Sequence, residues 1–122
     1  MINAMFPELS TTISAHRQKL APRQLDAFKA FSREVFADGA LPEKTKQLIA
    51  VAVAHTTQCP YCIRGHTRAA LRAGATEQEI MEAIWVAAEM RAGAAYAHSA
   101  LALDEMEHVA GQSSGHNIPT SK

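Results

Sequence analysis

The chain has 122 residues, of which 48% are hydrophobic and 20% charged, and its 12 basic and 12 acidic side chains give a formal net charge of zero. This length suits a single domain, and the composition excludes general disorder. A nucleic-acid surface would need a run of lysine and arginine, which is missing here. Because the N-terminus has no basic start and no segment reaches the roughly 18 apolar residues of a membrane span, we expect a cytoplasmic protein with neither nucleic acid nor membrane as a partner.

The first half of the chain has the apolar periodicity of helices and almost nothing that indicates strand. A weak helix is predicted over residues 8–20. Pro22 begins a stronger helix, because proline is favoured at the first helical position, and this helix ends at Asp38-Gly39. A third helix, residues 43–56, contains a nearly continuous apolar run over residues 48–53. We therefore expect the third helix to be buried on more than one side.

The second half continues in the same way. A fourth helix, residues 60–73, ends at a glycine, which is the usual stop signal of a helix. A capping box at residues 76–79 begins a fifth helix. Residues 90–93 are expected to bend or break that helix before a last helical segment over residues 94–109.

Small residues crowd the last predicted helix and the bend before it. They are Ala92, Gly93, Ala94, Ala95, Ala97, Ser99, Ala100 and Ala102. Small side chains let helix backbones approach closely, within one chain or between subunits, so a tightly packed monomer and a homo-oligomer both fit. We predict an all-α bundle of about six helices that forms oligomers, with one domain over residues 1–110. The polar residues 111–122 are expected to form a flexible tail.

The only two cysteines, Cys59 and Cys62, stand three positions apart, and His66 follows one turn later. Residues at this spacing face the same way on a helix, so the two sulfurs can approach bonding distance. Pro60 favours a helix start that makes Cys59 the N-cap, where free N–H groups and the helix dipole stabilise a thiolate. We predict Cys59 as the more acidic and more exposed thiol and Cys62 as its disulfide partner. His66 is the candidate that exchanges protons with them.

Two other interpretations of this cluster are open. The spacing of His55, Cys59, Cys62 and His66 would place four zinc ligands along one continuous helix. A proline interrupts that helix, however, and no second cysteine or histidine pair completes a zinc ribbon or finger, so we expect no metal and no cofactor. Two cysteines could also sit in a helical core by chance, but their polar neighbours disfavour this. In the cytosol such a pair stays reduced and is more often catalytic or metal-binding than structural.

Three segments carry a family resemblance: residues 41–54, residues 59–67 with the CxxCxxxH motif, and residues 69–76 with an AGAT turn. Over roughly residues 20–108 the chain resembles the AhpD-like branch of the carboxymuconolactone decarboxylase family. The resemblance implies an all-helical fold, homo-oligomers that are commonly trimers or hexamers, and thiol-dependent peroxidase or disulfide-exchange activity. Members of the decarboxylase branch lack the cysteine pair, so its presence favours the redox branch.

One position departs from the family pattern. The redox branch usually has a glutamate of the proton relay twelve residues before the first cysteine, and here that residue is Gln47. A glutamine can orient a histidine or hold a water, but it cannot accept a proton at neutral pH. Glu43, one turn earlier, could substitute, although it is more simply explained as a first-turn acid favoured by the helix dipole. His55 is another possible base, and its alternative is a helix-terminal histidine that bonds a nearby carbonyl.

We predict cysteine-based reduction of a hydroperoxide or disulfide, as in antioxidant defence. A thiolate attacks, a sulfenic acid or mixed disulfide forms, the second cysteine closes the Cys59–Cys62 disulfide, and an external dithiol reduces it. If His66 deprotonates Cys62, then Cys62 attacks first, and the order stays open. The alternatives are a non-catalytic redox switch and a zinc-binding oligomeric protein. Because Gln47 replaces a glutamate, the expected activity is weak.

Overall fold

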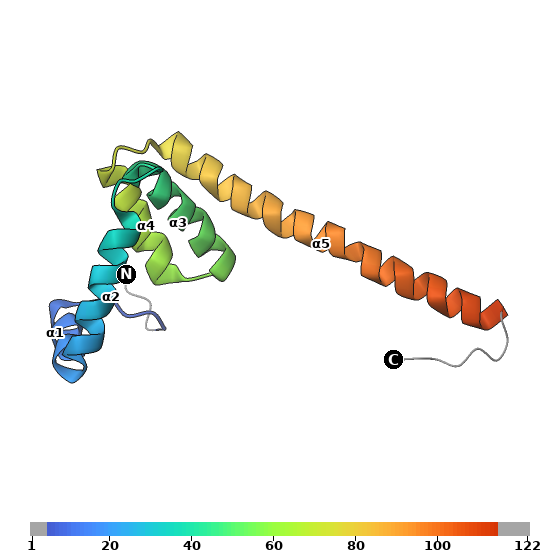
Figure 1. The fold of residues 1–122 in the computed structure, drawn as a ribbon, viewed down its shortest axis with the longest axis horizontal. Coiled ribbons are helices and arrows are strands. Elements are labelled where there is room, and N and C mark those ends of the chain that lie inside the picture. Colours follow the sequence, from blue (N-terminus) through green and yellow to red (C-terminus); the bar gives the residue numbers. More distant parts are fainter. Residues whose placement is uncertain (1–4, 115–122) are drawn as a thin grey trace.

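The computed structural model describes residues 5–114, and this part of the chain forms five helices and no strand. In chain order the helices are α1 (Thr11–Leu20), α2 (Pro22–Phe36), α3 (Glu43–Thr57), α4 (Pro60–Arg72) and α5 (Glu77–Ser114). The predicted all-α class is therefore confirmed. Helices α3 and α4 pack against each other, α1 and α2 lie together at one end, and α5 runs far past the other helices (Figure 1).

Local signals explain how α3 and α4 come together. Helix α3 begins at Glu43, whose backbone N–H donates to Oδ1 of Asp38 at 2.6 Å. It is followed by Gln58, which has a left-handed φ of 57° and reverses the chain direction. A second reversal, between α4 and α5, runs through Gly74 at a φ of 97°, a conformation that favours glycine. These two turns return α4 and then the start of α5 to the sides of α3.

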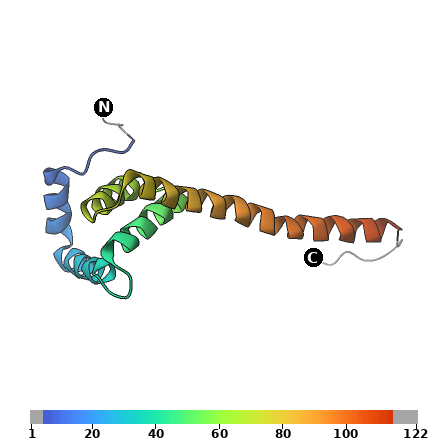
Figure 2. The same ribbon diagram turned by 90° about the horizontal axis from the view of Figure 1, so that it is seen from above.

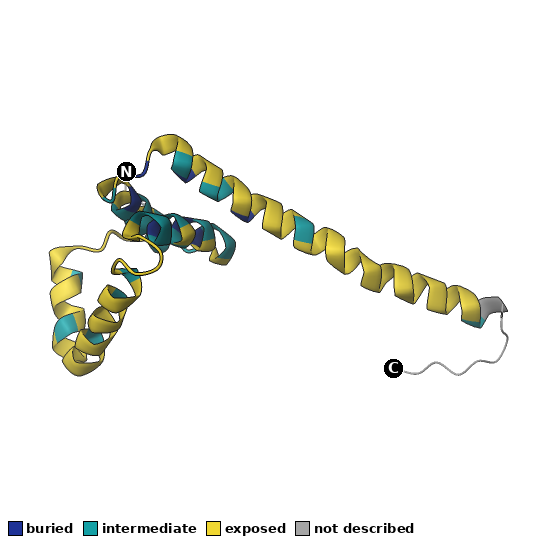
Figure 3. Cartoon of the chain, turned by 45° about the horizontal axis from the view of Figure 1, so that its top comes forward, coloured by how far each residue is buried: buried dark blue, intermediate teal, exposed yellow. Residues whose placement is uncertain are grey.

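The core is small and is built mostly from short side chains. Buried residues gather where α3, α4 and the first turns of α5 meet (Figure 3). Its buried apolar members are Val51, Ala54, Ala70, Ala75, Ile80 and Ala87. Alanine at these contacts lets the helix backbones approach closely, as helix packing requires. One polar side chain, Gln47, is buried beside this core with 5% of its surface exposed.

The predicted break at residues 90–93 is wrong, because α5 is continuous from Glu77 to Ser114. Its alanine-rich sequence explains the difference: glycine in a helix costs about 1 kcal/mol relative to alanine, and the surrounding alanines are the best helix formers. One glycine, Gly93, is therefore insufficient to end the helix. The described part of the chain has five helices in place of about six. Helix α5 also covers residues 111–114, which were predicted to begin the tail, and residues 115–122 lie outside the described residues.

The second half of α5 projects beyond α1–α4, and two perpendicular views agree on this (Figures 1 and 2). Large apolar and aromatic side chains stand exposed along α5. They include Trp85, Val86, Met90, Tyr96, Leu101, Leu103, Met106 and Val109. Tyr96 is 82% exposed and Leu101 69%. Within the described residues nothing covers these side chains, and an exposed apolar surface of this length is unusual for a soluble monomer. Within residues 5–114, no helix combines the length and the apolar character needed to cross a membrane.

Candidate active site

The two cysteines lie at the start of α4 and are bonded to each other. Cys59 is the N-cap of the helix, Pro60 takes its first position, and the Cα atoms of Cys59 and Cys62 are 5.2 Å apart across the disulfide. The backbone N–H of Cys62 also donates to Sγ of Cys59 at 3.2 Å. The first turn of α4 thus has the cap and the paired sulfurs that the spacing predicted. Both residues are half-buried, so the pair lies near the surface.

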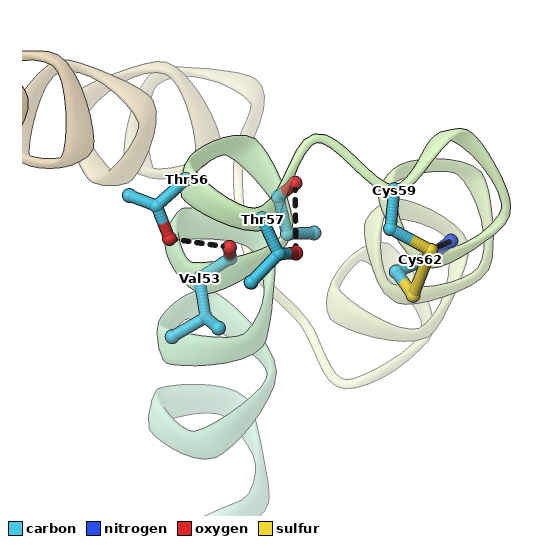
Figure 4. The surroundings of a disulfide bond; sticks show 6 residues. Val53, Thr56, Thr57, Cys59 and Cys62 are labelled. Atoms are coloured by element: carbon cyan, nitrogen blue, oxygen red, sulfur yellow. Dashed lines mark hydrogen bonds between the residues drawn. A yellow bond between two sulfur atoms is a disulfide. The ribbon is translucent and has the colours of Figure 1, made fainter.

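The end of α3 holds this pair in place. The backbone N–H of Cys59 donates to the carbonyl of Ala54 at 3.2 Å, which ties the N-cap of α4 to the last turn of α3. The hydroxyl of Thr56 donates to the carbonyl of Val53 at 2.6 Å, and that of Thr57 donates to Ala54 at 3.5 Å (Figure 4). Both hydroxyls therefore bond carbonyls of the last turn of α3, and the carbonyl of Ala54 accepts from the N–H of Cys59 as well. The disulfide therefore sits on a well-anchored turn.

His66 lies one turn after Cys62 on α4, and residues at this spacing share one face of a helix. Its Nδ1 is 2.7 Å from Oε1 of Gln47 on α3. Its ring stacks on that of Phe36 from the end of α2, with ring centroids 5.1 Å apart and an angle of 28° between the planes. An amide oxygen can only accept a hydrogen bond, so Nδ1 carries the hydrogen and the neutral ring has its lone pair on Nε2. Gln47 and Phe36 together fix both the tautomer and the plane of the imidazole.

Gln47 lies in direct contact with His66, although an amide cannot act as a base. It is the buried polar residue beside the core, and its amide oxygen is committed to His66. A glutamate at this position would place a negative charge beside the imidazole and could accept its proton. The glutamine orients the ring without that charge. Residue 47 is the position to which the sequence resemblance assigns the relay glutamate, and an amide stands there instead of a carboxylate.

The other two candidate bases lie elsewhere. Glu43 is exposed in the first turn of α3, and within the described residues no hydrogen bond or ion pair joins its carboxylate to His66. His55, in the last turn of α3, has its Nδ1 at 2.8 Å from the carbonyl of Val51. Since a carbonyl only accepts, that nitrogen carries the hydrogen. This is the contact expected of a helix-terminal histidine, and a role as a base stays a prediction for both residues.

For a metal, the described part of the chain offers no group of three or more histidine, cysteine, aspartate or glutamate side chains placed to bind it. The two sulfurs that a zinc site would need are bonded to each other. Zinc requires deprotonated thiolates as ligands. The start of α4 therefore carries a disulfide-bonded cysteine pair.

Two aromatic residues near the pair make contacts that had no signal in the sequence. Phe36 belongs to an apolar stripe of α2, and nothing in its spacing indicates that it covers His66 on α4. Tyr61, which stands between the two cysteines, donates its hydroxyl to the carbonyl of Pro7 at 2.8 Å. Its ring also meets that of Phe6 edge to face, with centroids 6.1 Å apart. All three contacts join distant parts of the chain, so only the folded structure reveals them.

Known proteins are similar to this chain in sequence and in fold. The sequence profile of the carboxymuconolactone decarboxylase family matches residues 22–105. A protein of Paracoccus denitrificans, known as uncharacterized protein 4 in the cox locus, is 67% identical over 86 residues, which cover 70% of this chain and 78% of that protein.

Two crystal structures also resemble the fold. A carboxymuconolactone decarboxylase family protein from Legionella pneumophila is 36% identical, with a TM-score of 0.64 over 80% of this chain and 88% of that one. A family protein from Thermotoga maritima, for which a part in the antioxidative response has been suggested, is 25% identical with a TM-score of 0.53. That match covers 75% of this chain and 95% of the Thermotoga chain.

Proposed function

The chain belongs to the carboxymuconolactone decarboxylase family, and from this membership and the bonded cysteine pair we propose that it is a thiol-dependent peroxidase or disulfide oxidoreductase of the AhpD-like branch. The observation that carries the proposal is the Cys59–Cys62 pair at the N-cap of α4, one turn before a histidine of fixed tautomer. The part in the antioxidative response that has been suggested for the Thermotoga relative also supports this proposal. A cytoplasmic location, where dithiols stay reduced, suits such a cycle.

The cycle begins with both cysteines reduced. A thiolate attacks the outer oxygen of a hydroperoxide, the O–O bond breaks, and the products are a sulfenic acid and, after protonation, an alcohol. The second thiol then attacks the sulfenic sulfur, which forms the disulfide and releases water. With a disulfide substrate, attack gives a mixed disulfide that the second thiol resolves. An external dithiol finally reduces the Cys59–Cys62 bond and is itself oxidised, so two electrons pass from dithiol to substrate in each turn.

We propose that His66 transfers the protons of this cycle. Because Gln47 receives its Nδ1 hydrogen, the lone pair of Nε2 can take the proton of a thiol and return it to the leaving oxygen. Gln47 is a positioning residue in this scheme, since it acts through the imidazole. Because Gln47 supplies no carboxylate, the imidazolium that forms has no negative charge beside its Nδ1. We infer that the native enzyme is slow for this reason.

Different features favour each of the two cysteines as the first nucleophile. Cys59 lies at the N-cap, where the unpaired N–H groups and the helix dipole favour a thiolate. Cys62 shares its helix face with His66 and is the thiol that a histidine base would deprotonate. We propose Cys59 as the first nucleophile, since its advantage does not depend on a proton transfer.

We also propose that the active form is a homo-oligomer, a hexamer or trimer as in the family. The support is the exposed apolar surface of α5, which includes Trp85, Tyr96, Leu101 and Met106. A second copy that packs on this surface would remove large apolar side chains from water. This burial stabilises the assembly by about 25 cal/mol for each Å² of apolar surface buried. The helix would then serve as an assembly element of the protein.

A coupled assay tests the proposal. Purified protein is given tert-butyl hydroperoxide or hydrogen peroxide with dithiothreitol, peroxide consumption is followed, and free thiols are counted in samples withdrawn before and after oxidation. The proposal expects peroxide consumption that Cys59→Ser and Cys62→Ser each abolish, together with loss of both free thiols on oxidation. Formation of the disulfide without catalytic consumption of peroxide or of a disulfide substrate would instead indicate a redox switch.

A further inference from the structure

A groove of about 600 Å³ lies between the N-terminal segment and the outer side of α4. Its lining residues are Phe6, Pro7, Glu8, Leu9, Pro60, Tyr61, Arg64 and Arg68. This volume falls within the range of roughly 300–1,000 Å³ that is typical of pockets for small molecules. The thiol cycle described above uses none of the groups that line this groove.

The N-terminal wall of the groove is held by defined contacts. The hydroxyl of Tyr61 donates to the carbonyl of Pro7 at 2.8 Å, and the ring of Phe6 meets that of Tyr61 edge to face. This segment then leads into α1, whose N-cap Ser10 accepts a hydrogen bond from the backbone of Ile13 at 3.2 Å. The apolar side of the groove is therefore fixed at both ends.

The opposite side carries two positive charges. Arg64 and Arg68 lie one turn apart on α4, and within residues 5–114 neither guanidinium forms a hydrogen bond or an ion pair. Like charges at this spacing destabilise a helix by about 0.2–0.5 kcal/mol. The single acid among the lining residues, Glu8, leaves one positive charge in excess. An anion in the groove would offset this charge.

We propose that this groove binds a small organic carboxylate with an apolar body. The two guanidinium groups would bind the carboxylate, for which the planar fork of arginine is suited. Phe6 and Leu9 would cover the apolar part. A groove closed on one side by the protein's own N-terminal segment suits a compact ligand better than the broad surface of another protein.

This ligand site is distinct from the thiol pair. Tyr61, Arg64 and Arg68 follow one another at spacings of three and four and so share one face of α4, whereas Cys62 and His66 share another. The groove and the pair meet only at Pro60 and Tyr61, between the two cysteines. Binding of the carboxylate should therefore not require the thiols, and it can be tested whether or not the protein is a peroxidase.

The test is an NMR titration of the full-length protein with octanoate, with octan-1-ol and octylammonium as probes of equal chain length. We expect octanoate to shift the amide signals of Phe6, Leu9, Tyr61 and Arg64 and to bind at least about tenfold more tightly than octanol, since one hydrogen bond to a charged group is worth about 1.5–3 kcal/mol. The Cys59→Ser/Cys62→Ser variant should bind octanoate as the native protein does.

Three double variants make the result specific. Arg64→Gln/Arg68→Gln should weaken octanoate binding at least about tenfold. Arg23→Gln/Lys29→Gln, which removes the same charge from exposed positions of α2, should leave it unchanged. Arg64→Glu/Arg68→Glu should reverse the preference, so that octylammonium binds better than octanoate. Equal binding of octanol and octanoate, or unchanged octanoate binding in the arginine variants, would overturn the proposal.

Discussion

Oε1 of Gln47 on α3 accepts a hydrogen bond from Nδ1 of His66 on α4 at 2.7 Å, and this contact joins the buried core to the face of α4 that carries Cys62. It fixes the imidazole with its lone pair on Nε2. The same contact supplies no charge, because an amide does not titrate at neutral pH. The site therefore separates the orientation of a histidine from its activation, and each can be measured on its own.

The first prediction concerns the reduced thiols. One of the two cysteines should react as a thiolate well below pH 8.5, the ordinary pKa of a free thiol, because Cys59 is the N-cap of α4. The rate of iodoacetamide alkylation against pH, measured on Cys59→Ser and Cys62→Ser, assigns the more acidic group. We expect the lower pKa in Cys62→Ser, which retains Cys59. If both variants titrate near 8.5, neither the helix start nor His66 activates the pair.

The second prediction concerns assembly. Light scattering at micromolar concentration should give a mass several times the 13.2 kDa of one chain, because the apolar surface of α5 has no partner within the described chain. Leu101→Glu/Met106→Glu, which places charges on this surface, should shift the mass toward one chain. Exposed Glu82→Lys on the same helix serves as a control for a change of charge alone. A mass of 13.2 kDa for the native protein would contradict the proposed oligomer.

Local signals made much of this structure predictable from the sequence. Pro22 and Pro60 mark the helix starts, and the capping box at residues 76–79 is present as expected. The break at residues 90–93 was wrong because alanine propensity outweighs one glycine. The stacking of Phe36 on the imidazole was not predictable, because it depends on how three helices pack and no local pattern encodes that.

The third prediction uses the capping box of α5. The backbone N–H of Thr76 donates to Oε1 of Glu79 at 2.9 Å, and Nζ of Lys44 lies 3.0 Å from Oε2. The bond from Thr76, followed by that from Lys44, lowers the pKa of the Glu79 carboxyl from its ordinary value of 4.5. A lowered pKa in the folded state means that the stabilisation is present above pH 4.5 and is lost as the pH falls through the lower folded value.

Glu79→Gln keeps a residue that a capping box accepts and removes only the charge. We expect its melting temperature to lie below that of the native protein at pH 7, and the difference to shrink as the pH falls below 4.5. Glu82→Gln, an exposed change on the same helix, is the matched control, and all proteins are compared at one concentration because assembly affects the melting temperature. A difference that is independent of pH would show that the charge of Glu79 contributes nothing.

The fourth prediction follows from the contact between Gln47 and His66. Gln47→Glu places a carboxylate on the nitrogen that the amide oxygen now faces, so it can stabilise the imidazolium that forms when Nε2 takes a proton. A general base contributes about 10² to 10⁴-fold to a rate, so we expect peroxide turnover at neutral pH to rise at least about tenfold. Since position 47 is buried, its environment raises the pKa of the new carboxyl and moves part of the gain to higher pH.

The pH–rate profile of the Gln47→Glu variant is therefore the measurement that tests this prediction. Exposed Gln24→Glu on α2 adds the same charge away from His66 and should leave the profile of the native protein unchanged. Glu43→Gln reports whether the acid one turn before position 47 already supplies a base, because the native rate would then fall. If Gln47→Glu has the native profile across the whole range while its fold is intact, proton transfer through His66 does not limit the rate. The 2.7 Å contact would then serve to orient the ring alone.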